Sequence, residues 1–221
     1  MQSDLGFIIE LVYFILLAVL SVAIYIRTKR VYDFSKHEGI KYFRNAFIFF
    51  ALIYFFRFIV LNVPFLDHFL ERGLLVGIES FSMFLVIYFS LLAIFNLTAS
   101  FSWKKIKMIS DNTLHFASLI LALIIFVFKL PIVLMIFGIA IILFLALKAY
   151  FNYKHKNHKM FSNLFVVYTL LLVFWFFDMV PFVQQFMKFE LKTAGYIISI
   201  LIFIYLNFKI KAVLESGKKK E

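Results

Sequence analysis

The chain contains no cysteine, which excludes disulfide bonds, thiolate metal sites and cysteine nucleophiles together. It also has few acidic residues, with 12 Asp and Glu against 23 Lys and Arg and a net charge of +11. In a soluble protein this charge would favour a nucleic-acid partner. Here the basic residues lie between long apolar runs, which is typical of the cytoplasmic loops of membrane proteins. We therefore expect no nucleic acid to bind.

Proline is scarce, and its positions are informative. The three prolines, Pro64, Pro131 and Pro181, fall at the ends of apolar runs, where a chain must turn. The first residues, MQSDLG, carry no basic side chain, and no small-residue cleavage site follows the first apolar run. A signal peptide needs both features, so we expect the first run to remain as a transmembrane helix.

Most residues of the chain are apolar. Hydrophobic residues make up 64% of the 221 positions, and the mean hydropathy is +0.98. A soluble domain of this length needs far more polar surface. Apolar runs of spanning length occur at residues 5–26, 43–63, 74–97, 113–128, 131–147, 161–180 and 194–208. The sequence therefore predicts an all-α integral membrane protein with a single seven-helix transmembrane domain over residues 1–221.

The basic residues set the expected orientation. All but five of the 23 Lys and Arg residues lie in connections on one side of the predicted spans or in the C-terminal tail. The exceptions are Arg57, inside a span, and Arg72, Lys129, Lys188 and Lys192 on the opposite side. Because cytoplasmic loops accumulate Lys and Arg, we predict a cell-membrane protein with its N-terminus outside and its C-terminus inside. The basic tail is expected to meet anionic membrane lipid.

An internal repeat is indicated when the sequence is aligned with a copy of itself that is shifted by a fixed number of residues. That offset aligns Arg30 with Lys148, Tyr32 with Tyr150, His37 with His155, Asn45 with Asn163 and Phe47 with Phe165. Chance matching of apolar runs explains identical polar residues at one offset poorly. We predict parallel repeats over residues 5–97 and 131–208, joined by a linker helix at 113–128. Known transporters with parallel repeats hold their site at the repeat interface near mid-membrane.

This 3+1+3 layout resembles that of the SWEET and PQ-loop transporters and, more loosely, that of the opsins. The resemblance covers topology only. The Pro-Gln pair of the PQ-loop family is missing from the first and fifth spans. The span at 194–208 has no lysine at its middle, where an opsin would hold retinal, and the HxxxH histidines of ceramidase-type hydrolases are missing. We therefore expect no cofactor.

Several ionisable residues lie inside the spans, where they are costly and usually functional. Glu10, Arg57, Glu79 and Asp178 lie on four different spans, each in the predicted outer half. Polar and aromatic residues share their helix faces at helical spacing. The candidate ligand-binding residues are Glu10, Tyr13, Tyr54, Arg57, Glu79, Ser82, Trp175 and Asp178. We expect them to surround a polar cavity that opens to the outside.

Arg57 and Glu79 are expected to pair with each other. Both are the same number of residues from His68, near the apex of the hairpin between their spans, so antiparallel helices would hold them at similar depth. Glu10 and Asp178 would then face ligand or water. The alternative is a purely structural ion-pair network. Three carboxylates against one arginine fit that alternative less well, because the surplus acids must be protonated, hydrated or bound to a cation.

Two groups of loop residues have side chains of the types that bind metal ions. His37 and His155 occupy matching places in cytoplasmic loops, and Asp67, His68 and Glu71 lie close together in an outer loop. Solvated loop side chains are far commoner than metal ligands in such positions. We expect no metal.

Three functions are compatible with these features. The first is a small-solute transporter or facilitator with a polar outer cavity, with proton coupling through Glu79 left open. The second is a seven-helix receptor or accessory membrane subunit that signals through a partner, either another membrane protein or a second copy of the chain. A membrane enzyme is third, and its general base would have to be a carboxylate. A transporter needs polar residues that continue to the cytoplasmic side, where Asn96, His115, Asn163 and Asn207 are the main candidates.

Overall fold

The computed structural model describes residues 2–63, 71–102, 110–156, 159–183 and 189–218, which form seven helices. The helices are α1 (Gln2–Ser35), α2 (Glu38–Asn62), α3 (Arg72–Ser102), α4 (Asp111–Val127), α5 (Pro131–Lys156), α6 (Lys159–Val183) and α7 (Phe189–Lys218). Each predicted span coincides with one helix to within a residue at its ends or lies inside it. The prediction of an all-helical chain with these seven elements is therefore confirmed for the described residues.

Five of the helices are long and apolar enough to cross a membrane, judged by length and composition over the described residues. These segments are Gly6–Ser35, Glu38–Asn62, Arg72–Ser102, Pro131–Asn152 and Thr193–Ile210. α4 and the segment Leu164–Asp178 of α6 are shorter apolar helices. Large apolar side chains such as Phe116 (65% exposed) and Leu201 (59% exposed) cover the outside of the bundle, as lipid contact requires. The chain is a helical, multi-pass membrane protein; the number of crossings, the orientation and the repeat remain predictions.

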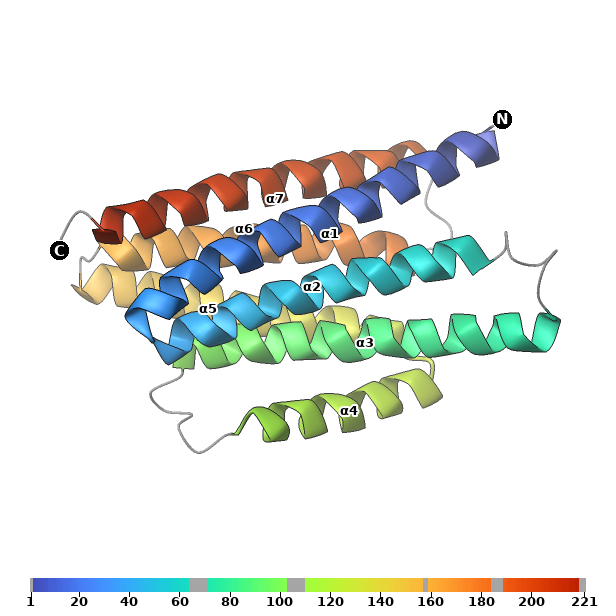
Figure 1. The fold of residues 1–221 in the computed structure, drawn as a ribbon, viewed down its shortest axis with the longest axis horizontal. Coiled ribbons are helices and arrows are strands. Elements are labelled where there is room, and N and C mark those ends of the chain that lie inside the picture. The colour runs from blue at the N-terminus through green and yellow to red at the C-terminus, as the bar shows by residue number, and fades with distance from the viewer. Residues whose placement is uncertain (1, 64–70, 103–109, 157–158, 184–188, 219–221) are drawn as a thin grey trace.

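The helices form a closed ring in chain order, with one helix outside it. α1 packs against α2, α2 against α3, α5 against α6, α6 against α7, and α7 against α1. α3 packs directly against α5, so α4 lies at the edge, mainly against α3 (Figure 1). The helices α1–α3 form one triplet and α5–α7 another, and in both the middle helix lies between its chain neighbours.

Two connections are made by lysines in the left-handed backbone region. Lys129 follows α4 with φ of 51°; its N–H donates to the carbonyl oxygen of Phe126 (3.2 Å), and the N–H of Leu130 donates to that of Ile125 (3.0 Å). This pair of bonds is the Schellman arrangement that ends a helix, usually with glycine at the left-handed position. The chain then enters α5 at Pro131, whose missing N–H costs nothing in the first turn. Lys36 also has φ of 51° and ends α1 with a single bond, from its N–H to the carbonyl oxygen of Tyr32 at 2.7 Å.

Candidate functional site

A buried ion pair joins the two triplets near the end of the bundle where α1 begins. Arg57 of α2 donates from Nη1 to both carboxylate oxygens of Asp178 on α6, at 2.8 and 2.9 Å. Arg57 is 7% exposed and Asp178 is 3% exposed. A charge buried this deeply is stable only with a partner, so the pair fixes the relative position of α2 and α6.

Tyrosines from three helices complete the group. The hydroxyl of Tyr13 on α1 donates to Asp178 Oδ1 at 2.8 Å. The ring of Tyr196 on α7 stacks on that of Tyr13 with centroids 4.1 Å apart, and its hydroxyl donates to Glu10 at 3.1 Å. The guanidinium of Arg57 lies 5.7 Å from the ring centroid of Tyr54, within the range of a cation–π contact. We call Glu10, Tyr13, Tyr54, Arg57, Asp178 and Tyr196 the Arg57 cluster.

Helical spacing explains why each helix can contribute to the Arg57 cluster. Tyr54 and Arg57 are three residues apart on α2, and Glu10 and Tyr13 are three apart on α1, so each pair shares a face. Those faces point to the bundle interior because the rest of each helix is apolar and can face lipid without cost. The cluster therefore follows from sequence periodicity on α1 and α2 and from the ring closure that brings α6 and α7 to them.

Most of the predicted site residues meet in this cluster. Glu10, Tyr13, Tyr54, Arg57 and Asp178 all belong to it, and Trp175 lies one turn from Asp178 on α6. Ser82 is buried in α3 but is separate from the hydrogen bonds of the cluster. Tyr196 is a member that the predicted set left out, although it lies on the polar face of its span.

The predicted pairing of Arg57 with Glu79 is wrong. Arg57 binds Asp178, and Glu79 is an exposed residue of α3. Counting residues from the hairpin apex gave the two side chains a similar depth, but depth does not fix the rotation of a helix about its axis. Arg57 faces the interior and reaches across the ring to α6, whereas Glu79 faces outward.

Beside the Arg57 cluster, the core is aromatic. Phe50 of α2 contacts Phe174 and Trp175 of α6 and Phe203 of α7, with ring centroids 6.1, 6.4 and 6.2 Å away. Phe174 and Phe203 are 4.5 Å apart, and Phe47 packs 6.2 Å from Phe203. Each of these five side chains is at most 1% exposed. We call them the aromatic layer, which fills the middle of the bundle between the triplets.

A second set of polar contacts joins the triplets toward the other end of the bundle. Arg27 of α1 donates to Asn207 Oδ1 of α7 at 3.1 Å, and the amide of Asn207 donates to the carbonyl of Leu20 at 3.3 Å. Two further bonds of this set are Ser100 Oγ with Tyr168 Oη at 3.0 Å and Lys148 Nζ with Ser102 Oγ at 3.2 Å. We call Arg27, Ser100, Ser102, Lys148, Tyr168 and Asn207 the Arg27 layer.

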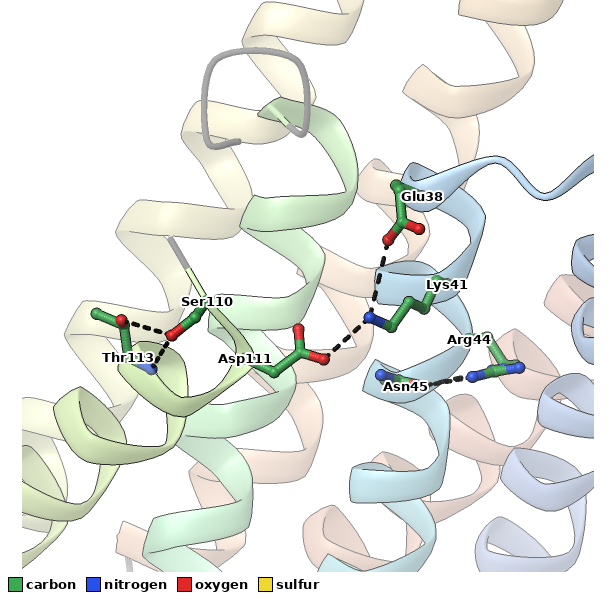
Figure 2. A network of polar contacts seen from close by, with 7 residues as sticks. All are labelled: Glu38, Lys41, Arg44, Asn45, Ser110, Asp111 and Thr113. Atoms are coloured by element: carbon green, nitrogen blue, oxygen red, sulfur yellow. Dashed lines mark hydrogen bonds and ion pairs between the residues drawn. The ribbon is translucent and has the colours of Figure 1, made fainter. Parts of the chain in front are cut away.

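α4 is held to the first triplet by polar side chains. Lys41 of α2 lies 2.9 Å from Asp111 of α4 and 3.8 Å from Glu38, as Figure 2 shows. Ser110 caps α4 by accepting a hydrogen bond from the N–H of Thr113 at 3.3 Å (Figure 2). These contacts attach the beginning of α4 to α2.

A small polar pocket lies between α2, α3 and α4. Its lining residues are Asn45, Phe49, Asn96, Asp111, Leu114 and His115. His115 Nδ1 is 2.8 Å from Tyr88 Oη of α3, and the Asn96 amide donates to the carbonyl of Leu92 in its own helix at 2.8 Å. Two of the expected inner polar residues, Asn96 of α3 and His115 of α4, therefore line this pocket at the contact of α4 with the first triplet.

The structure describes the side chains of only two of the loop residues considered as metal ligands, His37 and Glu71. His37 is exposed at the start of α2, and Glu71 is exposed before α3. Asp67, His68 and the side chains of His155 and Asn163 lie outside the described residues. Among the side chains that the structure describes, no three His, Cys, Asp or Glu residues come close enough to hold a metal ion.

The fold and the Arg57 cluster together define a helical membrane protein whose triplets are joined by a buried ion pair. The chain is similar to an uncharacterized protein of Archaeoglobus fulgidus, with 28% identity over 208 residues that cover 91% of this chain and 90% of that protein. No protein-family model matches the chain, and no solved structure is detectably similar to it. The similarity extends over nearly the whole of both proteins and assigns no activity to this chain.

Proposed function

We propose that the protein is a small-solute transporter or facilitator of the cell membrane, with the N-terminus outside and the C-terminus in the cytoplasm. One observation carries this proposal. Among the described residues, the side-chain hydrogen bonds between the triplets fall into two sets near opposite ends of the bundle, separated by the aromatic layer. This is the arrangement that alternating access needs, because one set can open while the other holds.

The proposed moving bodies are α1–α4 and α5–α7. α4 belongs with the first body because Lys41 and Tyr88 bind its side chains, whereas its packing against α5 is slight. The connection from α4 to α5 is short, so it is the natural hinge. The same neighbour order within both triplets supports the proposed parallel repeat of residues 5–97 and 131–208.

In this mechanism the Arg57 cluster is the outer gate and binding site. Opening separates α2 from α6, which breaks the Arg57–Asp178 pair and exposes the tyrosines to solvent. Breaking a buried ion pair without replacement costs about 3–5 kcal/mol. Water or solute that enters the gap offsets this cost by binding both charges. The aromatic layer meanwhile seals the cytoplasmic side, where the Arg27 layer is still closed.

Uptake by proteoliposomes tests the proposal. The purified full-length chain is reconstituted and assayed against a panel of labelled small solutes at two pH values, with protein-free liposomes as the background. Saturable uptake of at least one solute, lost in Asp178→Asn and retained in Asp111→Asn, is the expected result. Dependence on the pH gradient would add proton coupling. If the protein binds one of the solutes but shows no saturable uptake of any solute in the panel, transport is refuted.

A receptor is the second candidate, and one observation favours it. The aromatic layer is closely packed, and the inner polar residues Asn96 and Thr98 bond to carbonyl oxygens of their own helix at 2.8 and 3.0 Å. A receptor needs no polar path to the cytoplasm, only a change in helix packing on binding. Ligand binding without uptake, together with recovery of the same partner protein in the presence of ligand, would establish this function instead.

A further inference from the structure

The Arg57–Asp178 pair restricts the charge of any solute that binds between its members. Both groups are buried, and the pair is electrically neutral as a unit. A solute with one charge could satisfy only one member and would leave the other charged and buried without its counter-ion. A solute with a positive and a negative group replaces the internal pair by two external pairs, so neither Arg57 nor Asp178 loses its counter-charge.

The surroundings of the two charges differ in a way that assigns each end of such a solute. Asp178 is approached by the hydroxyl of Tyr13, whose ring stacks on Tyr196, and Glu10 is bonded to Tyr196. A carboxylate that already accepts a hydrogen bond from a tyrosine hydroxyl has acceptor sites left for an ammonium group, whose charge it complements. The guanidinium of Arg57 favours a carboxylate, which it can bind through more than one N–H.

The packing also limits the size of the solute. The Tyr13 and Tyr54 ring centroids are 6.1 Å apart, and both rings are 1% exposed. The aromatic layer beneath, with Phe50 and Trp175 buried to the same degree, leaves no room in the closed state for a long side chain. Arg57 and Asp178 are in direct contact at 2.8 Å, so the smallest opening between them admits a solute whose two charges are separated by only a few bonds.

From these observations we infer that the Arg57 cluster binds a small zwitterion of the amino-acid class. Its carboxylate lies on Arg57, and its ammonium group lies on Asp178 among the tyrosine rings. This inference deepens the proposed function and rests on it for the opening of the gate. It goes further by naming the chemical class of the solute.

Binding to the purified full-length chain in detergent tests the inference. The zwitterionic probes are alanine, β-alanine, γ-aminobutyrate and glycine betaine, and the matched controls are propionate, ethylamine and propionamide. Propionate carries only the negative charge of alanine, ethylamine only the positive charge, and propionamide neither. We expect at least one zwitterion to raise the melting temperature in a saturable way and to bind at least tenfold more tightly than all three controls.

Two variants connect this binding to the proposed residues. The double variant Arg57→Gln with Asp178→Asn removes both charges of the pair and keeps two side chains that can hydrogen-bond, so it should fold and lose at least tenfold in affinity for the zwitterion. Asp111→Asn, on α4, should bind like the unmodified protein. The inference is overturned if no zwitterion binds, if propionate or ethylamine binds as tightly as the zwitterions, or if the double variant binds unchanged.

The outcomes separate this inference from the proposed function. Binding of a zwitterion that is never taken up by proteoliposomes would refute transport and leave the assignment of the solute class intact. Saturable uptake of a neutral or singly charged solute, with no zwitterion bound, would leave transport intact and refute the assignment.

Discussion

The Arg57–Asp178 pair allows a quantitative test of how the bundle is held together. In the variant Arg57→Met, Asp178 stays buried at 3% exposure and loses its counter-charge, although Tyr13 still donates to it. Removing one member of a buried pair costs about 3–5 kcal/mol. Asp178→Leu should cost a similar amount, because it removes the carboxylate that binds Arg57. If the two effects were independent, the double variant would lose about 6–10 kcal/mol.

The double variant should lose much less than that sum. No unpaired charge remains in it, and well-packed apolar side chains often replace a buried pair without net loss. The main remaining cost is the hydroxyl of Tyr13, which loses its acceptor, and this is worth about 1–3 kcal/mol. We therefore expect a coupling energy of several kcal/mol, measured by reversible unfolding in mixed micelles followed by circular dichroism.

Glu79 supplies the matched control for this experiment. It is exposed on α3, whereas Arg57 pairs with Asp178, so Glu79→Gln should change stability by less than about 0.5 kcal/mol. The Arg57→Met and Glu79→Gln changes should also be additive within about 0.5 kcal/mol. Additivity of the Arg57 and Asp178 variants, or coupling of Arg57 with Glu79, would refute the assignment of the pair.

Three further predictions concern packing, backbone and orientation. Gly138→Ala on α5 should destabilise the protein by about 1–3 kcal/mol in thermal melts, because the new Cβ would overlap the buried indole of Trp175. Gly77→Ala is the control: its new Cβ meets nothing within 4 Å, so the variant should be neutral or stabilising in the same melts. Lys129→Gly should stabilise the protein by about 1 kcal/mol in those melts, since glycine adopts φ of 51° without strain; a loss of stability would contradict the reading of this turn. A cysteine introduced at Gly217 of this cysteine-free chain should react with an impermeant maleimide only from the cytoplasmic side, and labelling from outside would reverse the proposed topology.

The sequence alone determined the elements of the fold. Apolar runs bounded by charges and prolines located all seven helices, because a helix in lipid must satisfy its backbone internally and cover itself with apolar side chains. Helical spacing also placed Tyr13, Tyr54 and Arg57 on interior faces. These are local properties that depend on residues three or four positions apart.

The partners of the buried charges were decided only by the tertiary structure. Arg57 could in principle have met any of Glu10, Glu79 and Asp178, since the sequence places all three in the predicted outer half of the membrane. The choice depends on how each helix is rotated and on which helices face each other across the ring, and residue spacing within one helix does not encode either. Ring closure put Asp178 opposite Arg57, brought Tyr196 to Glu10, and left Glu79 on the outside.

The position of α4 was decided in the same way. The sequence predicted a linker helix at 113–128 but not its docking through Asp111 and His115 onto α2 and α3. A short apolar helix carries few side chains that would specify one packing partner over another. Its place follows from direct packing of α3 against α5, which leaves only the outside of the ring free.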